Sequence, residues 1–252
     1  MDKPRFSTHR SQCDPQTILD ASTEVDCEDC GLDPICMVLD YAEEASGVPE
    51  GVLLRRRPVE RGEIIFRQDD PFRSLFAVKS GSFKTSMENG GQSKRVIGFQ
   101  FPGELIGVEA MSRGKYPCTA RALQNGSVCE LHIARLPESG RPLEALQAAV
   151  IELLGKEVAF NHQLVSSLVH QSAEQRICGF ILSLSSRLAH RRLPSLEFTF
   201  TMSRTDIGNY LGLASETVSR VLTRMGRSGA IHLQRKRIRI LDRNALEQCA
   251  DG

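Results

Sequence analysis

The pattern of hydrophobic and polar residues divides the chain into four segments. Residues 1–50 are polar and have no sustained period, although 37–45 permits one short helix. Residues 51–142 place short apolar runs between glycine, proline and asparagine, a pattern typical of antiparallel strands in a roll or barrel. Residues 143–171 take a helical period, and residues 172–252 continue with shorter helices. The sequence therefore predicts an α+β protein: an N-terminal antiparallel β-roll, a long helix and a C-terminal helical domain.

The strand predictions for the roll rest on five runs separated by turns. Asn89-Gly90-Gly91 has the composition of a tight hairpin turn. The runs are residues 62–66, 74–78, 81–85, 95–99 and 127–131.

The helix predicted over residues 143–171 carries two apolar stripes. One has the 3-4 spacing of a coiled-coil seam, and the opposite stripe, which includes Leu164, is also apolar. One face can therefore pack on its own domain and the other on a second copy; a helix wholly buried in one chain is the alternative. Asn161 falls in the seam, where one polar residue commonly fixes the oligomeric state. The predicted dimer interface is Ile151, Leu154, Val158, Asn161, Val165 and Leu168.

Residues 203–241 have the pattern of a winged helix-turn-helix. Ser203 and Asp206 have the spacing of a capping box that begins one helix. A glycine ends it, and Ser215 is expected to cap a second helix that ends at Gly229. Two strand-like runs around a basic turn follow at 231–241. This combination is typical of DNA-binding domains, whereas a plain helical hairpin with a solvated charged face is the alternative.

The second helix of this motif carries side chains suited to reading bases. Arg220 can donate two hydrogen bonds to guanine, and Glu216 can accept one from cytosine. Phosphates would repel the Glu216 carboxylate, so it suits only a base contact. Basic side chains nearby suit phosphates, which position a protein without reading sequence. The predicted DNA-contacting residues are Ser215, Glu216, Ser219, Arg220, Arg224 and Arg235, with Arg227, Lys236, Arg237 and Arg239 extending the basic surface.

The distribution of charge supports a nucleic-acid partner. The 252 residues have a net charge of +1, but residues 1–50 carry −9, residues 51–170 carry +4 and residues 171–252 carry +6. There is no run of 18 apolar residues and no signal-peptide pattern at the N-terminus. We therefore expect a cytoplasmic protein without a membrane-spanning helix.

Three of the eight cysteines, Cys27, Cys30 and Cys36, lie within ten residues in the spacing C-x2-C-x5-C. In a cytoplasmic chain such crowding indicates metal or redox chemistry rather than a disulfide framework. Zinc and iron–sulfur clusters both require four ligands. Cys129, in a predicted strand, is the best fourth ligand, and Cys118 is the second choice. The residues alone leave four readings open: a cluster, zinc, redox thiols or no site.

The other cysteines are not expected to take part in this site. Cys178 lies among apolar residues and is expected to be a buried free thiol. Cys13 and Cys249 lie near the chain ends and are expected to be incidental.

The order of β-roll, long helix and winged helix-turn-helix is that of the cAMP receptor protein superfamily. The chain resembles its oxygen-sensing branch, the fumarate–nitrate reduction (FNR) regulators, over nearly its whole length. The most specific pieces of the resemblance are the C-x2-C-x5-C motif, Ala122–Glu130 and Asp206–Arg220.

This resemblance implies how the cysteines and the recognition helix act. In the family, an intact [4Fe–4S] cluster favours a DNA-binding homodimer, and oxygen converts the cluster and releases monomer. RNA polymerase is a further implied partner. By the resemblance, Glu216, Ser219 and Arg220 read a TTGAT-type half-site that is repeated in a palindrome. The implied cluster ligands are Cys27, Cys30, Cys36 and Cys129.

Control by a cyclic nucleotide is not expected. Phe101–Leu105 resembles the start of the family's cAMP phosphate cassette, but Pro117-Cys118 stands where the phosphate-binding Arg-Ser pair would be. A cyclic phosphate would lose its charge-assisted partner there. Gly103 and Glu104 are therefore expected to be structural.

We predict a homodimeric, non-enzymatic transcription regulator that senses oxygen through a cluster and acts as an activator of anaerobic genes. The alternative keeps the DNA-binding role but replaces the cluster with zinc or thiol–disulfide chemistry. A redox enzyme built on the C-x2-C pair lacks the surrounding βαβ pattern. No nucleophile–base arrangement or phosphate-binding loop is present, and the six histidines show no ligand spacing. Asn161 replaces an acid of the family, so we expect cluster loss to dissociate this dimer less completely.

Overall fold

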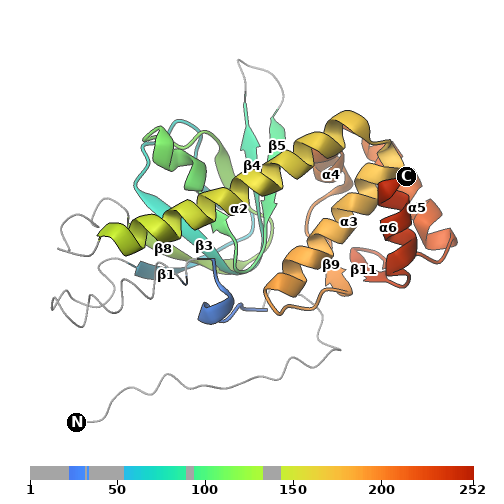
Figure 1. Ribbon diagram of the computed structural model, residues 1–252, viewed down its shortest axis with the longest axis horizontal. Coiled ribbons are helices and arrows are strands. Elements are labelled where there is room, and N and C mark those ends of the chain that lie inside the picture. The colour runs from blue at the N-terminus through green and yellow to red at the C-terminus, as the bar shows by residue number, and fades with distance from the viewer. Residues whose placement is uncertain (1–22, 32, 34–53, 89–93, 133–142) are drawn as a thin grey trace, which may run out of the picture.

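The computed structural model describes residues 23–31, 33, 54–88, 94–132 and 143–252. These residues form a β-roll, one long helix that passes across it, and a helical domain with a small sheet (Figure 1). This is the predicted α+β architecture. Within these ranges, no helix combines the length and apolar character needed to cross a membrane. The short helix predicted over 37–45 and the Asn89–Gly91 turn lie outside the described residues.

The β-roll consists of two antiparallel sheets whose inner faces share a core around Phe76, Phe83 and Val128. The sheet orders are β1-β8-β3-β6 and β2-β7-β4-β5. The strands are β1 (Leu54–Val59), β2 (Ile64–Phe66), β3 (Ser74–Ser80), β4 (Phe83–Met87), β5 (Arg95–Gln100), β6 (Leu105–Ile106), β7 (Thr119–Ala122) and β8 (Gly126–His132), with a short 3₁₀ helix η2 (Val108–Ser112) between β6 and β7.

Strand β1 is not among the predicted strands, because its sequence lacks the apolar pattern of a strand. It contains three consecutive arginines followed by Pro58. Among the described residues, the strand lies at the edge of its sheet and pairs only with β8, from Leu54 opposite Leu131 to Val59 opposite Gly126. An edge strand tolerates proline and charge because one side of its backbone needs no partner strand.

The helical part begins with α2, which crosses the roll and leads into the C-terminal domain (Figure 1). Its sheet has the order β10-β11-β9. The helices are α2 (Leu143–His170), α3 (Ala173–His190), α4 (Arg204–Leu211), α5 (Ser215–Arg227) and α6 (Arg243–Asp251), and the strands are β9 (Glu197–Thr199), β10 (Ile231–Gln234) and β11 (Arg237–Ile240).

The roll and the helical domain share one hydrophobic core. Val96, Phe99 and Phe101 of the roll pack in the same buried cluster as α3 and α4. The rings of Phe99 and Tyr210 lie 5.2 Å apart, edge to face. Because this contact is apolar and buried, the position of the helical domain depends on the roll.

The prediction that Cys178 is a free thiol and Cys249 incidental is wrong. The two residues form a disulfide between α3 and α6, with their Cα atoms 6.2 Å apart. Helix α6 is not among the predicted helices; it begins where the Asp242 carboxylate accepts a hydrogen bond from the Ala245 amide. Without that helix, nothing in the sequence indicates that these two cysteines, which are separated by 71 residues, lie close to each other.

The expectation that Ser215 caps α5 is also wrong. Ala214 is the N-cap, with no side-chain cap bond, and Ser215 is the first helical residue. The turn fixes this start, because the Leu213 amide bonds the Gly208 carbonyl and the next helical bond runs from Val218 to Ala214.

Candidate DNA-binding and cysteine sites

The helix-turn-helix is built from a capped helix, a glycine turn and a second helix. The capping box of Ser203 and Asp206 at the start of α4 is present as predicted. Gly212 ends α4 in the left-handed conformation (φ 67°), which costs glycine little. A side chain on Gly208 would approach the Leu213 carbonyl to 2.5 Å, so only glycine allows the turn to close this tightly.

Helix α5 separates a buried stripe from an exposed one. Its buried residues are Val218, Val221, Leu222 and Met225, as expected from the sequence. Glu216, Ser219 and Arg220 are exposed on the other side, and Ser215 is half-buried. The exposed face therefore presents a carboxylate, a hydroxyl and a guanidinium within about a turn and a half, where an approaching duplex could meet them.

Basic side chains surround this face, and some of them are already paired. Arg235 is exposed at the turn between β10 and β11, with φ 56°. Arg239 pairs with Glu197 at 2.6 Å, and Arg224 pairs with Glu174 at 2.8 Å. Both pairs involve largely exposed arginines, so they are weak in water and can yield to phosphate.

The predicted seam of α2 is exposed in the single chain. Ile151, Val158 and Val165 are 69%, 52% and 59% exposed, and Leu154 is also exposed. Leu168 is half-buried, whereas the side chain of Asn161 lies outside the described residues. Leu164, on the other stripe, packs against the shared core. Large apolar side chains in a row facing water indicate a surface that another molecule covers.

The cysteine segment lies along the edge of β3. The Val25 side chain is buried, and the Val25 amide donates to the Lys79 carbonyl at 3.0 Å. Glu24 forms an isolated antiparallel β-bridge with Ser80. The 3₁₀ helix η1 (Cys27–Asp29) follows, and the Gly31 amide then donates to the Gly103 carbonyl at 2.7 Å. These contacts fix the start of the C-x2-C-x5-C motif against the roll.

This docking brings Cys27 and Cys30 toward Cys129 of β8. Burial, then the neighbouring Cys30, raises the pKa of the Cys129 thiol, while Lys79 and Arg56 act to lower it. Lys79 Nζ lies 3.9 Å from Cys27 Sγ, and Arg56 is the register partner of Cys129 on β1. Three cysteines that are not joined in a disulfide thus lie in the same neighbourhood as two cations.

Cys36 lies outside the described residues. Within those residues, no three His, Cys, Asp or Glu side chains are grouped closely enough to hold a metal ion. The four-cysteine ligand set therefore stays a prediction.

Cys118 lies in a different environment from Cys129. It is buried in the core of the roll, and its thiol donates to the Glu109 carboxylate at 3.1 Å. Burial, with a smaller contribution from Glu109, raises the pKa of the Cys118 thiol far above its usual range. A thiol held protonated inside a core is a poor metal ligand, because the thiolate is the binding form.

A set of contacts that no pattern in the sequence predicts joins the cysteine segment to α3. Arg191, which follows α3, donates to the Asp29 carbonyl, and Arg192 pairs with the Asp29 carboxylate. A side chain on Gly103 would approach Arg191 Cδ to 2.8 Å, so all three segments meet at this glycine. These residues lie in separate segments of the sequence, and no local pattern marks them.

Glu104, expected to be structural, connects the roll to α3. Its carboxylate accepts hydrogen bonds from Arg187 Nε at 2.7 Å and from the Phe101 amide at 3.0 Å. Arg187 also donates to the Phe99 carbonyl. The Glu104 carboxylate is thus already hydrogen-bonded within the protein.

Comparison with known proteins agrees with this architecture. A model of the cyclic nucleotide-binding domain matches residues 56–137, and a model of the Crp-like helix-turn-helix domain matches residues 175–249. The structure of FixK2 from Bradyrhizobium japonicum superposes with a TM-score of 0.70 at 23% identity, covering 79% of this chain and 98% of that one. That likeness establishes the fold.

Two relatives establish the family. The chain is 39% identical to the transcriptional activator protein anr of Pseudomonas aeruginosa, covering 91% of this chain and 93% of that protein. It is 32% identical to the fumarate and nitrate reduction regulatory protein of Escherichia coli, covering 90% of each chain. The chain therefore belongs to the FNR-type branch of the CRP/FNR family of transcription regulators.

Proposed function

We propose that the protein is a homodimeric transcription activator that senses oxygen through a [4Fe–4S] cluster and regulates anaerobic genes at TTGAT-type palindromes. The observation that carries the proposal is the docking of the cysteine segment on β3, which sets Cys27 and Cys30 beside Cys129. The partners would be double-stranded DNA, RNA polymerase and a second copy of the chain. No cyclic nucleotide and no enzymatic activity are part of the proposal.

The chemistry of these side chains suits an iron–sulfur cluster. Iron–sulfur clusters are held by cysteine thiolates, and none of Cys27, Cys30 and Cys129 is joined in a disulfide. Lys79 and Arg56 supply positive charge, which favours the thiolate form and offsets the negative charge of a thiolate-bound cluster. Cys36 would complete the set. When bound, the cluster would supply the chemistry that reacts with oxygen.

Two sets of contacts would connect the cysteine segment to the rest of the protein. Along the roll, β8 carries Cys129 and pairs with β3, against which the cysteine segment is docked. Toward the DNA-binding domain, Asp29 is bonded to Arg191 at the end of α3. Ligation of Cys27 and Cys30 would hold Asp29 in place and so support α3, which packs against the recognition helix α5.

DNA binding would combine base contacts with phosphate contacts. Glu216, Ser219 and Arg220 would read bases, while Arg224 and Arg235 would bind phosphates. Dimerisation would place two α5 helices on one face of the duplex, because a palindrome mirrors the twofold symmetry of a dimer. The exposed seam of α2 supports this pairing.

Iron and sulfide analysis of the anaerobically purified chain tests the proposal. We expect about four iron and four sulfide per chain, following the composition of a [4Fe–4S] cluster. Cys129→Ser should empty the site, and Cys118→Ala should leave it full. Bound zinc would contradict the proposal and favour a zinc site. A protein without metal but with a reversible disulfide among these cysteines would favour thiol–disulfide chemistry.

A further inference from the structure

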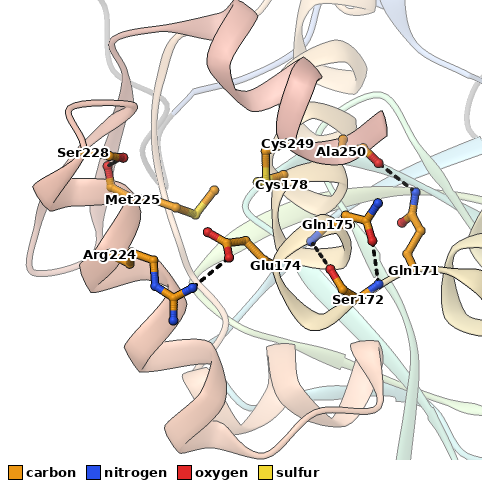
Figure 2. The surroundings of a disulfide bond; sticks show 10 residues. All are labelled: Gln171, Ser172, Glu174, Gln175, Cys178, Arg224, Met225, Ser228, Cys249 and Ala250. Carbon is orange, nitrogen blue, oxygen red and sulfur yellow. Dashed lines mark hydrogen bonds and ion pairs between the residues drawn. A yellow bond between two sulfur atoms is a disulfide. The ribbon is translucent and has the colours of Figure 1, made fainter. Parts of the chain in front are cut away.

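We propose that Cys178 and Cys249 form a second redox site, a reversible dithiol–disulfide pair that is oxidised by hydroperoxides and reduced by dithiols. The bond joins α3 to α6 inside the DNA-binding domain (Figure 2). The four other described cysteines are not in disulfides, so the pairing is selective. The site stands apart from the cysteine segment and does not depend on a bound cluster.

The two helices hold the cysteines within bonding distance whether or not the bond is present. Their Cα atoms are 6.2 Å apart, inside the range that a disulfide spans without backbone movement. Leu246 of α6 is buried in the shared core, and Arg243 donates to the Ser185 hydroxyl of α3 at 3.2 Å. Since these contacts do not involve sulfur, the reduced pair would remain aligned and could close again.

The difference in burial between the two thiols sets the order of oxidation. Cys178 is fully buried, whereas Cys249 is half-buried on the last helix of the chain. The Cys249 thiolate would attack one oxygen of a hydroperoxide, forming an S–O bond and breaking the O–O bond. The other oxygen leaves and takes up a proton, which releases water or an alcohol. Cys178 would then attack the Cys249 sulfur and displace hydroxide, which leaves as water with the Cys178 proton. Two thiols become one disulfide, and the peroxide receives the two electrons.

Reduction would follow the reverse route from the exposed side. A thiolate of a dithiol reductant attacks Cys249 and releases the Cys178 thiolate, which takes up a proton. The second thiol of the reductant then displaces Cys249 and closes the reductant's own disulfide. A DNA-binding regulator works where thiols are kept reduced, and disulfides that form there are usually transient and redox-sensing.

The bond lies beside the joint between the dimer helix and the DNA-binding domain. Gln171, between α2 and α3, donates to the Ala250 carbonyl next to Cys249 at 3.2 Å and accepts a hydrogen bond from the Ser167 hydroxyl of α2 at 2.6 Å. One turn before Cys178, Glu174 pairs with Arg224 of the recognition helix (Figure 2). Oxidation would therefore fix α6 onto the part of α3 that faces both the joint and α5.

Oxidation should stabilise the domain as a whole. The bond closes a loop whose ends lie 71 residues apart in the sequence. This loop contains α4, α5 and the strands β10 and β11, which form the wing. A crosslink around so long a loop restricts the unfolded chain and raises the stability of the folded one. We infer that the pair keeps the DNA-binding domain folded under oxidising conditions.

Peptide mapping of the full wild-type chain tests the pairing without a variant. The chain is treated with hydrogen peroxide, alkylated in denaturant and digested with trypsin, which cuts after Arg176, Arg187 and Arg243. Peptides 177–187 and 244–252 should appear joined, and dithiothreitol should separate them. If both cysteines are fully alkylated after peroxide treatment, or if dithiothreitol does not restore them, the proposal is wrong.

Thermal unfolding tests the consequence. In cluster-free protein, the unfolding midpoint of the DNA-binding domain should be about 10 °C higher in the oxidised protein than in the reduced protein. Cys249→Ser, at the less buried position, should lose this difference, with Cys249→Ala as a second variant should serine disturb folding. Cys13→Ser, which removes a cysteine that is part of neither site, should keep it. Equal midpoints for oxidised and reduced wild type, or a difference that persists in both Cys249 variants, would overturn the stabilising role.

Discussion

The Nη1 atom of Arg191 donates a hydrogen bond to the backbone carbonyl of Asp29 across 2.8 Å. The bond connects the residue that follows α3 with the helical turn that holds Cys27. The Cys178–Cys249 bond touches the same helix near its other end, about 20 Å away at 1.5 Å per residue. Helix α3 is thus contacted at one end by the cysteine segment and at the other by the disulfide.

Removing this hydrogen bond should weaken the link between cluster and DNA. In Arg191→Ala, the ratio of DNA affinities between cluster-loaded and cluster-free protein should fall about 3–10-fold, because one hydrogen bond contributes about 1 kcal/mol. Arg192→Ala is the matched control, since the Arg192 side chain is 76% exposed and meets Asp29 only at 3.4 Å. An unchanged ratio in Arg191→Ala would show that this contact carries no coupling.

Arg220 and Arg235 should affect DNA binding in different ways. Arg220→Ala should cost about 1–3 kcal/mol on the cognate half-site and relax selectivity at one guanine, because it removes a two-bond base contact. Arg235→Ala should weaken binding to all sequences and flatten the salt dependence, because a phosphate contact carries no sequence information. Titrations of cognate and random duplexes at several salt concentrations separate the two effects. A uniform loss on both duplexes in both variants contradicts the assigned roles.

The dimer should depend less on its cluster than it would with an acid at position 161. Two asparagines can hydrogen-bond across a twofold axis, whereas two carboxylates about 4 Å apart repel by roughly 1–4 kcal/mol. Asn161→Asp should therefore weaken the cluster-free dimer by about one to three powers of ten. Sedimentation of the two cluster-free proteins measures this directly. Equal dissociation constants would mean that Asn161 does not face its partner and that the seam is misassigned.

The contact between Lys84 and Asp206 should make the interface of the roll and the DNA-binding domain sensitive to acid. The two groups pair at 2.5 Å. Burial acts to raise the pKa of Asp206, but hydrogen bonds from Lys84 and Ser203 outweigh it, so the pKa lies below its usual value of 3.8. The folded state therefore favours the carboxylate, and its contribution is present above about pH 4 and is lost as the pH falls through the folded pKa.

Asp206→Asn should remove this contribution. At pH 7 the free energy of unfolding should fall by about 1–2 kcal/mol, and the gap from wild type should close at acid pH. Lys84→Gln should have the same effect, and the double variant should add little, because both remove one interaction. Denaturant titrations of the cluster-free proteins between pH 7 and pH 2 measure this difference. A difference in the free energy of unfolding that stays constant over this range would refute the assignment.

Local signals in the sequence were sufficient to predict the DNA-binding domain. Ser203 and Asp206 form a capping box through contacts three residues apart, and the buried stripe of α5 follows from helical spacing. The start of α5 was misplaced by one residue, because the turn and not the serine side chain decides it. Helix α6 was missed, because only a short apolar stripe marks it.

The candidate site was less predictable, because contacts distant in sequence position it. The C-x2-C-x5-C motif marks Cys27 and Cys30, and the predicted strand context favours Cys129 over Cys118. The bonds of Lys79 and Arg191 to the cysteine segment depend on how separate segments pack. The Cys178–Cys249 pair required a helix that the sequence did not reveal.

The most direct test of oxygen sensing is to follow DNA affinity and cluster content in one sample as air is admitted. Anaerobic protein should bind a TTGAT palindrome tightly, and its affinity should fall at least about tenfold in step with the loss of the cluster. Cys129→Ser should show the low affinity from the start. An affinity that stays constant while the cluster is lost would contradict the account.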